Sequence, residues 1–376
     1  MIAWLLISFF VLLFLGVPIA MSLGLSAMGG ILFLGGGSTV TIAQRMFEGM
    51  NSFALLAIPL YTFAGFTMSK GGISKRLMDF CYSIVGHIYG GLAHVNVLSS
   101  MIFAGISGSA VADTAGVSGM FMPEMVRKGY SKNFTVAVTA ISSTIGIIIP
   151  PSIPMVVIAG ICGISTGKLF LGGIIPGVLC GLAQMIVSYF MAKKEGVPKE
   201  PGHFTIGPVL HGLWESWPAL LMPIIIVGTI TMGIVSPTEA GVIAVVYGLF
   251  AGGIIYRELK WEDIKFAFAE TVRTSGRIFI VIGAAKLYTV MLTTAGFDKW
   301  VAKTMLGFST NPTVILIMIL LIFFIVTMFM ESIATLTLFM PILYPIALGV
   351  GIDPIVLSVL ITVVIGVGLV TPPVGM

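Results

Sequence analysis

The sequence predicts an all-α polytopic membrane protein, built as an inverted repeat with two re-entrant helical hairpins and two broken helices. Hydrophobic residues make up 57% of its 376 residues and charged residues only 9%, whereas a soluble domain carries about 25% charged residues. Apolar runs of membrane-spanning length recur along the chain. Motifs of the first half return in the second half in the same order, and weak internal symmetry of this kind is typical of secondary transporters.

The composition excludes several classes of function. So few charged residues cannot cover the surface of a globule this size, and the mean hydropathy is +1.11. Soluble enzymes and nucleic-acid binders are therefore excluded, and we expect no nucleic-acid partner. The formal charge of +4 fits a bias of Lys and Arg toward cytoplasmic loops. The three cysteines and four histidines share no metal-ligand spacing.

A membrane helix needs about 20 apolar residues. Apolar segments of roughly this length fall at 2–36 (one long tilted helix or two short ones), 52–69, 80–105, 110–125, 134–160, 168–192, 213–235, 239–256, 278–295, 312–330, 334–350 and 355–376. The first of these lacks a basic leader and a small-residue cleavage site, so we interpret it as a membrane segment and not as a signal peptide.

Lys and Arg predict the orientation of the segments. The linker 193–208 and the segment 257–265 are basic, whereas the connection 236–239 between them has no Lys or Arg. The positive-inside rule places both basic loops in the cytoplasm. Because Pro150-Pro151 recurs as Pro372-Pro373 on a segment of opposite orientation, the two repeats are predicted to be inverted.

Two polar, Gly-rich interruptions predict the hairpin tips. One is 105–119 in a hairpin around 95–126, and the other is 330–337 in a hairpin around 315–348. Irregular backbone survives at membrane depth only inside protein or beside water. An acidic residue such as Asp113 is costly there and indicates a functional site, although Ser and Thr are also common in helix packing.

The Pro-Pro pairs predict broken helices over 134–160 and 355–376. Each proline lacks an N–H donor, so carbonyls about one turn upstream lose their partners. Hydroxyls lie nearby, and oxygen ligands without thiol or imidazole suit a hard cation such as Na⁺. The sequence stops inside the second apolar run, so we expect that break to be truncated.

An enzyme is a competing interpretation. Gly105-Ile106-Ser107-Gly108 has the GxSG form of an intramembrane serine protease, and His94 lies nearby in sequence. The motif is short, and it does not explain the repeated Pro-Pro break. We therefore expect a protein that is not an enzyme.

A family resemblance rests on five stretches of sequence. They are AIPLYTFAGFTMSKGGISKRL (57–77), SGSAVADTAGV (107–117), IIPPSIPMVV (148–157), PTEAG (237–241) and LVTPPVGM (369–376). Together they resemble the large membrane subunit of tripartite ATP-independent periplasmic (TRAP) transporters.

The resemblance implies an elevator-type ion-transporter fold in the bacterial inner membrane. It implies Na⁺ as the coupling ion, and sialic acid or a C4-dicarboxylate as the class of organic-acid substrate. The implied partners are a small four-helix membrane subunit and a periplasmic substrate-binding protein, besides membrane lipid. A binding-protein-independent carboxylate/Na⁺ symporter is the alternative transporter.

The resemblance also implies site residues and domains. The substrate-side residues are Ser107, Ser109, Asp113 and Ser152. The Na⁺ residues are Ser107, Gly108, Ser143, Thr144, Gly146, Ser332, Thr335, Gly366, Gly368 and Thr371. The transport domain is expected over 75–165 and 275–376, and the scaffold over 1–70 and 165–260.

Overall fold

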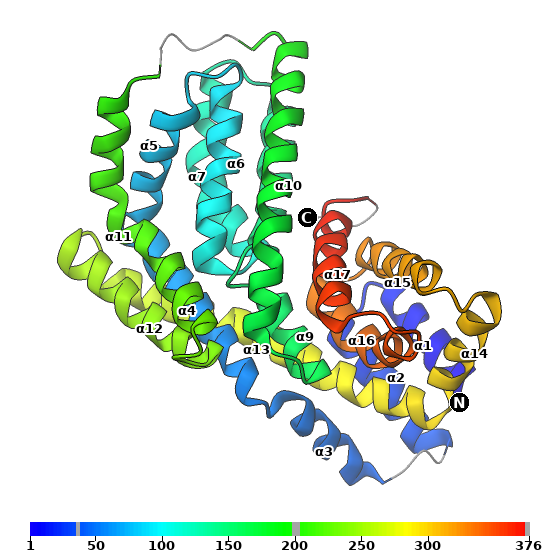
Figure 1. Ribbon diagram of the computed structural model, residues 1–376. Helices are drawn as coiled ribbons and strands as arrows, with labels where there is room; N and C mark the ends of the chain where they lie inside the picture. The colour runs from blue at the N-terminus through cyan, green and yellow to red at the C-terminus, as the bar shows by residue number, and fades with distance from the viewer. Residues whose placement is uncertain (35–37, 198–203, 373–376) are drawn as a thin grey trace. The chain divides into compact units, whose positions relative to one another are not determined.

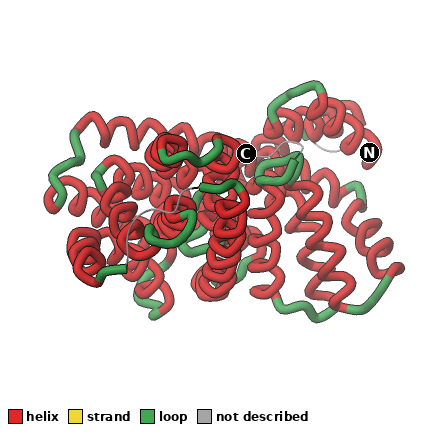
Figure 2. The backbone as a smooth tube through the Cα atoms, turned by 90° about the horizontal axis from the view of Figure 1, so that it is seen from above, coloured by secondary structure: helices red, strands yellow, loops and turns green. Residues whose placement is uncertain are grey.

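The computed structural model describes residues 1–34, 38–197 and 204–372, and every regular element in these ranges is a helix (Figures 1 and 2). The prediction of an all-α fold is confirmed. The middle of the predicted linker, 198–203, and the end of the second Pro-Pro motif, 373–376, lie outside the described residues.

The helices form two compact units that interleave along the sequence. The terminal unit comprises Met1–Leu56, Pro154–Ser165 and Thr274–Gly375, and the central unit comprises Ala57–Ile153 and Thr166–Arg273. The central unit holds α4 (Ala57–Lys70), α5 (Ile73–Val85), α6 (Gly91–Ser107), α7 (Ala110–Arg127), α8 (Lys132–Ser143), the 3₁₀ turn η2 (Thr144–Ile147), α10 (Thr166–Lys194), α11 (Ile206–Thr231), α12 (Pro237–Phe250) and the π turn η3 (Ala251–Ile255). The terminal unit holds α1 (Ile2–Phe14), α2 (Ile19–Leu34), α3 (Thr39–Met50), the 3₁₀ turn η1 (Phe53–Leu56), α14 (Phe297–Phe308), α15 (Pro312–Thr327), α16 (Ser332–Gly349) and α17 (Pro354–Leu369). The helices α9 (Ile153–Cys162) and α13 (Trp261–Thr294) each begin in the central unit and continue in the terminal unit.

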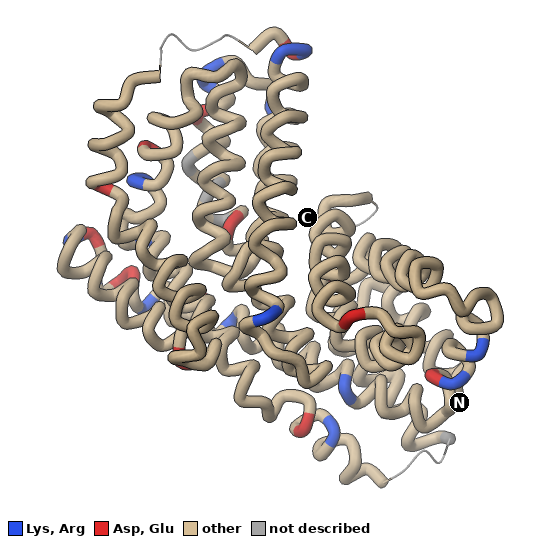
Figure 3. The backbone as a smooth tube through the Cα atoms, viewed as in Figure 1, with Lys and Arg blue, Asp and Glu red and all other residues tan. Residues whose placement is uncertain are grey.

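Several helices are long and apolar enough to cross a membrane. Six such spans occur among the described residues: Phe53–Lys70, Thr166–Lys194, Ile206–Thr231, Pro237–Ile255, Trp261–Thr294 and Ser332–Gly349. Charged residues lie mostly near helix ends and connections (Figure 3). The chain is a multi-pass membrane protein.

Glycines divide two of the predicted apolar segments. The run 2–36 forms two short helices, one of the two alternatives that the sequence left open, because Gly16 has a φ of 81° and Pro18 follows it. The run 80–105 was expected to be one segment, but α5 ends at Val85 and α6 begins at Gly91. Glycine accounts for the division, since Gly90 adopts a φ of 76°, a conformation that other residues rarely adopt.

Within the central unit, α6 packs against α5, α7, α8 and α10 (Figure 1). The α6 residues Ala93 and Val97 contribute to an apolar core together with Phe121, Met125 and Phe134. Ala93 and Val97 anchor the N-terminal half of α6 in the core. In α4, the buried Tyr61 hydroxyl donates a hydrogen bond of 2.8 Å to the Pro237 carbonyl at the start of α12.

Within the terminal unit, Tyr288 of α13 is buried and donates a hydrogen bond of 2.9 Å to the Leu5 carbonyl of α1. Tyr61 and Tyr288 occupy the same place in the repeated Leu-Tyr-Thr motif. Each therefore ties its own helix to a neighbouring one, which gives the sequence repeat a common structural role.

Candidate functional site at the first hairpin tip

The first hairpin turns between α6 and α7. Gly108 terminates α6 with a φ of 65°, a left-handed conformation that favours glycine. Ser109 is the N-cap of α7, and its side chain accepts a hydrogen bond of 3.4 Å from the Ala112 N–H. The predicted residues Ser107, Gly108 and Ser109 therefore form the tip of this hairpin.

The first break follows α8. The single turn η2 leads to the Pro150-Pro151 pair, and α9 begins at Ile153. Because prolines stand four residues after Gly146 and Ile147, neither carbonyl can receive the usual helical hydrogen bond. The Ile147 carbonyl accepts a hydrogen bond from the Ser152 hydroxyl instead. The hydroxyl of Ser152, which was predicted to face the substrate, therefore forms a hydrogen bond inside the break.

The tip and the break are in direct contact. The Ile153 N–H donates a hydrogen bond of 3.0 Å to the Gly108 carbonyl. A Cβ atom on Gly146 would lie 3.3 Å from the carbonyl carbon and oxygen of Ser109, and one on Gly108 would lie 2.6 Å from the Pro151 oxygen. Glycine at both positions lets the two irregular backbones approach this closely.

Two polar groups at the tip are buried without protein partners. The Asp113 carboxylate, in the first turn of α7, is fully buried, and so is the Ser107 hydroxyl. Among the residues that the structure describes, neither carboxylate oxygen nor the Ser107 hydroxyl has a hydrogen-bond partner. A buried carboxylate without a partner is strongly unfavourable, which makes this tip the candidate site for a cation or a hydrogen-bond donor.

A polar network that the sequence analysis missed lies behind Asp113. Asn96 donates a hydrogen bond of 2.8 Å to Thr139 and accepts one of 2.9 Å from Ser142. Ser142 in turn accepts a hydrogen bond of 3.2 Å from Ser100, whose hydroxyl lies beside the Asp113 carboxyl. The sequence signal that could have revealed this network is the spacing of its polar residues. Asn96 and Ser100 are four residues apart on α6, and their partners share one face of α8.

The hydroxyls predicted for Na⁺ near the first break are compatible with a cation. Ser143 and Thr144 are buried, and each donates its proton to a carbonyl of its own helix, Ala140 and Ile141 respectively. Their oxygen lone pairs remain for a ligand. These hydroxyls and the Gly146 carbonyl are oxygen donors, which a hard cation prefers over sulfur or imidazole.

The second hairpin turns between α15 and α16 in the terminal unit. Its acidic residue, Glu331, is the N-cap of α16 and accepts hydrogen bonds of 2.9 and 3.4 Å from the Ile333 and Ala334 N–H groups. The predicted residues Ser332 and Thr335 are buried in the first turn of α16. The Thr335 hydroxyl donates to the Glu331 carbonyl.

The second break follows α17 in the same unit. Gly366 and Gly368 are buried, and Gly368 packs directly against the Thr327 side chain of α15. The Thr371 hydroxyl donates a hydrogen bond of 2.7 Å to the Val367 carbonyl. Pro373, the second proline of this motif, lies outside the described residues.

The protease interpretation fails on geometry. His94 and Ser107 lie on the same helix, α6. A rise of 1.5 Å per residue separates them by about 20 Å along the axis. The His94 Nε2 atom instead lies 3.2 Å from the Tyr89 carbonyl, so these two residues cannot act as a nucleophile and base.

Comparisons with known proteins identify the family of this chain. The family described as "Tripartite ATP-independent periplasmic transporter, DctM component" matches residues 6–376. The chain belongs to this family. DctM members similar to it include the isethionate TRAP transporter permease protein DctMQ of Oleidesulfovibrio alaskensis, at 38% identity over 98% of this chain. The chain spans 58% of that relative's length.

Two further DctM relatives are of similar closeness. The sialic acid TRAP transporter large permease protein SiaM of Vibrio cholerae is 36% identical, over 97% of this chain and 85% of that protein. The C4-dicarboxylate TRAP transporter large permease protein DctM of Pseudomonas aeruginosa is 37% identical, over 94% of this chain and 83% of that protein. The predicted TRAP resemblance is confirmed.

The fold has a solved neighbour. The crystal structure of the Alcanivorax borkumensis YdaH transporter matches with a TM-score of 0.57, at 13% identity, over 87% of this chain and 77% of that one. At this identity the likeness concerns the fold alone. It shows that a DctM chain shares its helical architecture with another membrane transporter.

Proposed function

We propose that this chain is the permease of a Na⁺-coupled uptake system for an organic acid in the bacterial inner membrane. It would work with a small four-helix membrane subunit and a periplasmic binding protein that delivers the substrate. The family to which the chain belongs supports the assembly, since its description names tripartite periplasmic transporters. The basic linker 193–208 would face the cytoplasm.

One observation carries the proposal. Asp113 and Ser107 are fully buried at the first tip without protein partners, where that tip contacts the Pro150-Pro151 break. A buried acidic residue in a membrane protein marks a functional site, where a ligand supplies the missing partner of the carboxylate. Ser109 and Ser152 lie at the same tip and break, so these four residues form the proposed substrate side.

Electrostatics supports Na⁺ coupling. An organic anion that approaches the Asp113 carboxylate is repelled, and this repulsion is strong in a low dielectric. Na⁺ held by the oxygens of Ser107, Gly108 and Gly146 would offset it. The ion then raises the affinity for the acid, and by reciprocity the acid raises the affinity for the ion.

The second half would supply the other Na⁺ oxygens, from Ser332, Thr335, Gly366, Gly368 and Thr371. The loaded transport domain, 75–165 and 275–376, would then move against the scaffold as an elevator. Na⁺ can drive this movement only by binding more tightly to the state that holds the substrate.

The substrate class is a small organic acid. Relatives carry the names of isethionate, sialic acid and C4-dicarboxylate transporters, and each of these substrates is an anion. No Arg occurs in 105–119 or 330–337, so a bidentate clamp on the acid is absent from both tips. Recognition would rest on hydroxyls and helix N-termini, and on the binding protein.

The test is uptake into proteoliposomes that hold this permease with its small subunit. Radiolabelled sialic acid and succinate are offered with and without the binding protein and an inward Na⁺ gradient. Uptake that requires both supports the proposal. Uptake that needs Na⁺ without the binding protein supports the alternative symporter, and uptake that ignores Na⁺ contradicts both.

A further inference from the structure

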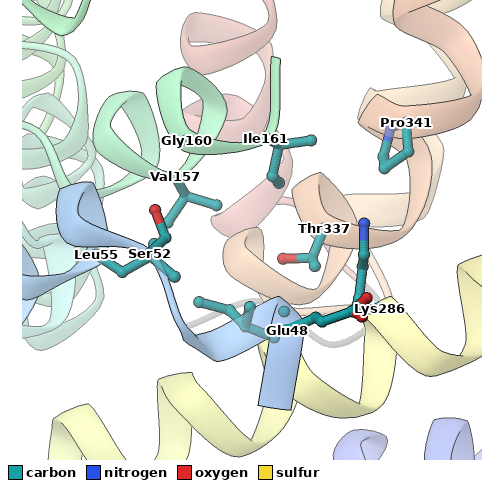
Figure 4. Close-up of a pocket in the computed structure, with 11 residues that line it drawn as sticks. Glu48, Ser52, Leu55, Val157, Gly160, Ile161, Lys286, Thr337 and Pro341 are labelled. Atoms are coloured by element: carbon teal, nitrogen blue, oxygen red, sulfur yellow. The ribbon is translucent and has the colours of Figure 1, made fainter. Parts of the chain in front are cut away.

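The terminal unit contains a cavity away from both hairpin tips. It measures about 170 Å³. Its walls are mostly apolar, and they carry a few polar groups from Glu48, Ser52, Lys286 and Thr337. Lys286, Thr337 and Pro341 lie along one side of it, and Ser52, Leu55 and Val157 lie along the other (Figure 4).

Lys286 is the unusual member of this lining. It lies on α13 within the apolar span Trp261–Thr294, and α3 crosses the helix so closely that a Cβ atom on Gly49 would lie 2.6 Å from the Lys286 Cβ. This contact fixes the base of the side chain at the cavity wall. Lys286 is exposed at this wall, and its ammonium nitrogen lies on the same side of the cavity as Pro341 (Figure 4).

The Lys286 charge has no counter-ion within the part of the chain that the structure describes. The nearby carboxylate of Glu48 forms a 2.8 Å ion pair with Arg45, and no ion pair or hydrogen bond engages the Lys286 ammonium. A cation within an apolar span is costly and calls for an anion. The Thr337 proton is donated to the Ile333 carbonyl, so the donors that face the cavity are the Lys286 ammonium and the Ser52 hydroxyl.

We infer that this cavity binds a single oxyanion group, with the Lys286 ammonium as its counter-ion. The volume is below the roughly 300 Å³ at which pockets for drug-sized ligands begin, so it suits one carboxylate or phosphate group and not a whole sugar acid. The apolar lining from Leu55, Val157 and Ile282 suits a ligand whose remainder is apolar or compact. Lys binds such groups as a point charge.

Two sources can supply this chemistry: the headgroup of an anionic lipid, or a free organic acid. The experiment measures the rate at which an amine-acetylating reagent modifies Lys286, read by peptide mass spectrometry. The permease is held with its small subunit in nanodiscs of phosphatidylcholine, of phosphatidylcholine with phosphatidylglycerol, or of phosphatidylcholine with added succinate. Lys303 of α14 is exposed and outside the cavity, so it serves as a control in the same digest.

A bound oxyanion engages the ammonium and shields it from the reagent, so acetylation of Lys286 should slow by about tenfold relative to Lys303, as expected for one charged hydrogen bond. Slowing by phosphatidylglycerol assigns the lipid source, and slowing by succinate assigns the free acid. Equal rates in all three preparations would overturn the inference, and so would equal slowing of Lys303.

A cavity-filling variant tests the location. A Cβ atom on Gly160 would have its nearest neighbours at 3.8 and 3.9 Å, which are ordinary contacts, so Gly160→Leu adds bulk beside the cavity while Lys286 stays. It should abolish the protection. Gly276→Leu, where nothing lies within 4 Å, should keep it. Protection that survives Gly160→Leu would contradict binding in this cavity.

Discussion

Asp113 of the first hairpin and Glu331 of the second both stand at the start of the helix that leaves the tip, yet only Glu331 bonds to its own helix. Glu331 receives two backbone N–H groups of α16. At the first tip Ser109 is the N-cap of α7, which leaves both Asp113 oxygens without hydrogen bonds from any described residue. Glu331 therefore matches Ser109 as the helix cap, and the two acids at the tips have different roles.

The difference separates a structural acid from one that awaits a ligand. A carboxylate that caps a helix stabilises the fold by about 1 kcal/mol. A buried carboxylate without partners destabilises the fold until a ligand compensates for it. The comparison indicates that the first tip is stabilised by a ligand and the second by its own helix. Variants of the two acids should therefore differ in uptake and in the response of their stability to Na⁺.

The largest effect is expected from the acids themselves. Asp113→Asn removes the negative charge that pairs with the bound cation. Na⁺-driven uptake should therefore fall by about thirtyfold or more, as for the loss of one partner of a buried charge pair. Glu331→Gln should retain uptake within about fivefold, because it weakens only a helix cap. Uptake assays in proteoliposomes measure both. A comparable loss of uptake in the two variants would contradict the different roles of the two tips.

The next effect concerns the contact between the first tip and its break. Gly146→Val places a branched side chain against the Ser109 backbone, and overpacking of this kind costs about 1–3 kcal/mol. Uptake should fall by about tenfold. Gly119→Val on α7 is the matched control, since nothing lies within 4 Å of a Cβ there. A Gly146 variant that transports as well as its control would show that the close approach is dispensable.

The network behind Asp113 should have an intermediate effect. Asn96→Ala leaves Thr139 and Ser142 without their shared partner, which costs about 1 kcal/mol or more, so the Na⁺ concentration for half-maximal uptake should rise by about fivefold. Thr337→Val in the second hairpin removes a hydroxyl bonded only to its own helix and should change it little. If wild type and Asn96→Ala need the same Na⁺ concentration for half-maximal uptake, the network does not contribute to Na⁺ binding.

The smallest effects are expected from single hydroxyls. Ser107→Ala should raise the half-maximal Na⁺ concentration by a few-fold, because one oxygen of several is lost. Thr371→Ala should raise it less, since that hydroxyl already bonds to Val367. Na⁺ titration of uptake compares the two variants. Normal Na⁺ dependence in both would refute the Na⁺ assignment at these positions.

The sequence predicted the helical fold, and it placed the first tip at Ser107–Ser109, because apolar length and Gly-rich interruptions are local signals. It did not reveal which faces of the helices meet. The helices of this site are apolar on most sides, so periodicity does not mark an inward face. The network of Asn96, Ser100 and Thr139 was therefore missed.

Side-chain partners were equally hidden from the sequence. Asp113 and Glu331 looked alike as isolated acids in apolar surroundings, and only the fold distinguishes a cap from an unpartnered carboxylate. Ser152 looked free to face a substrate, but its hydroxyl donates to the Ile147 carbonyl inside the break. Such choices depend on backbone geometry at the tips and breaks, which local composition does not specify.

The most direct test of the comparison is the thermal stability of the purified permease as NaCl replaces KCl at constant ionic strength. A ligand that binds only the folded state raises stability by about 2.7 kcal/mol at a hundredfold excess over its Kd. Wild type and Glu331→Gln should gain stability with Na⁺. Asp113→Asn should start more stable, because its buried charge is gone, and should gain clearly less than wild type. An undiminished Na⁺ response in Asp113→Asn would contradict the account of the first tip.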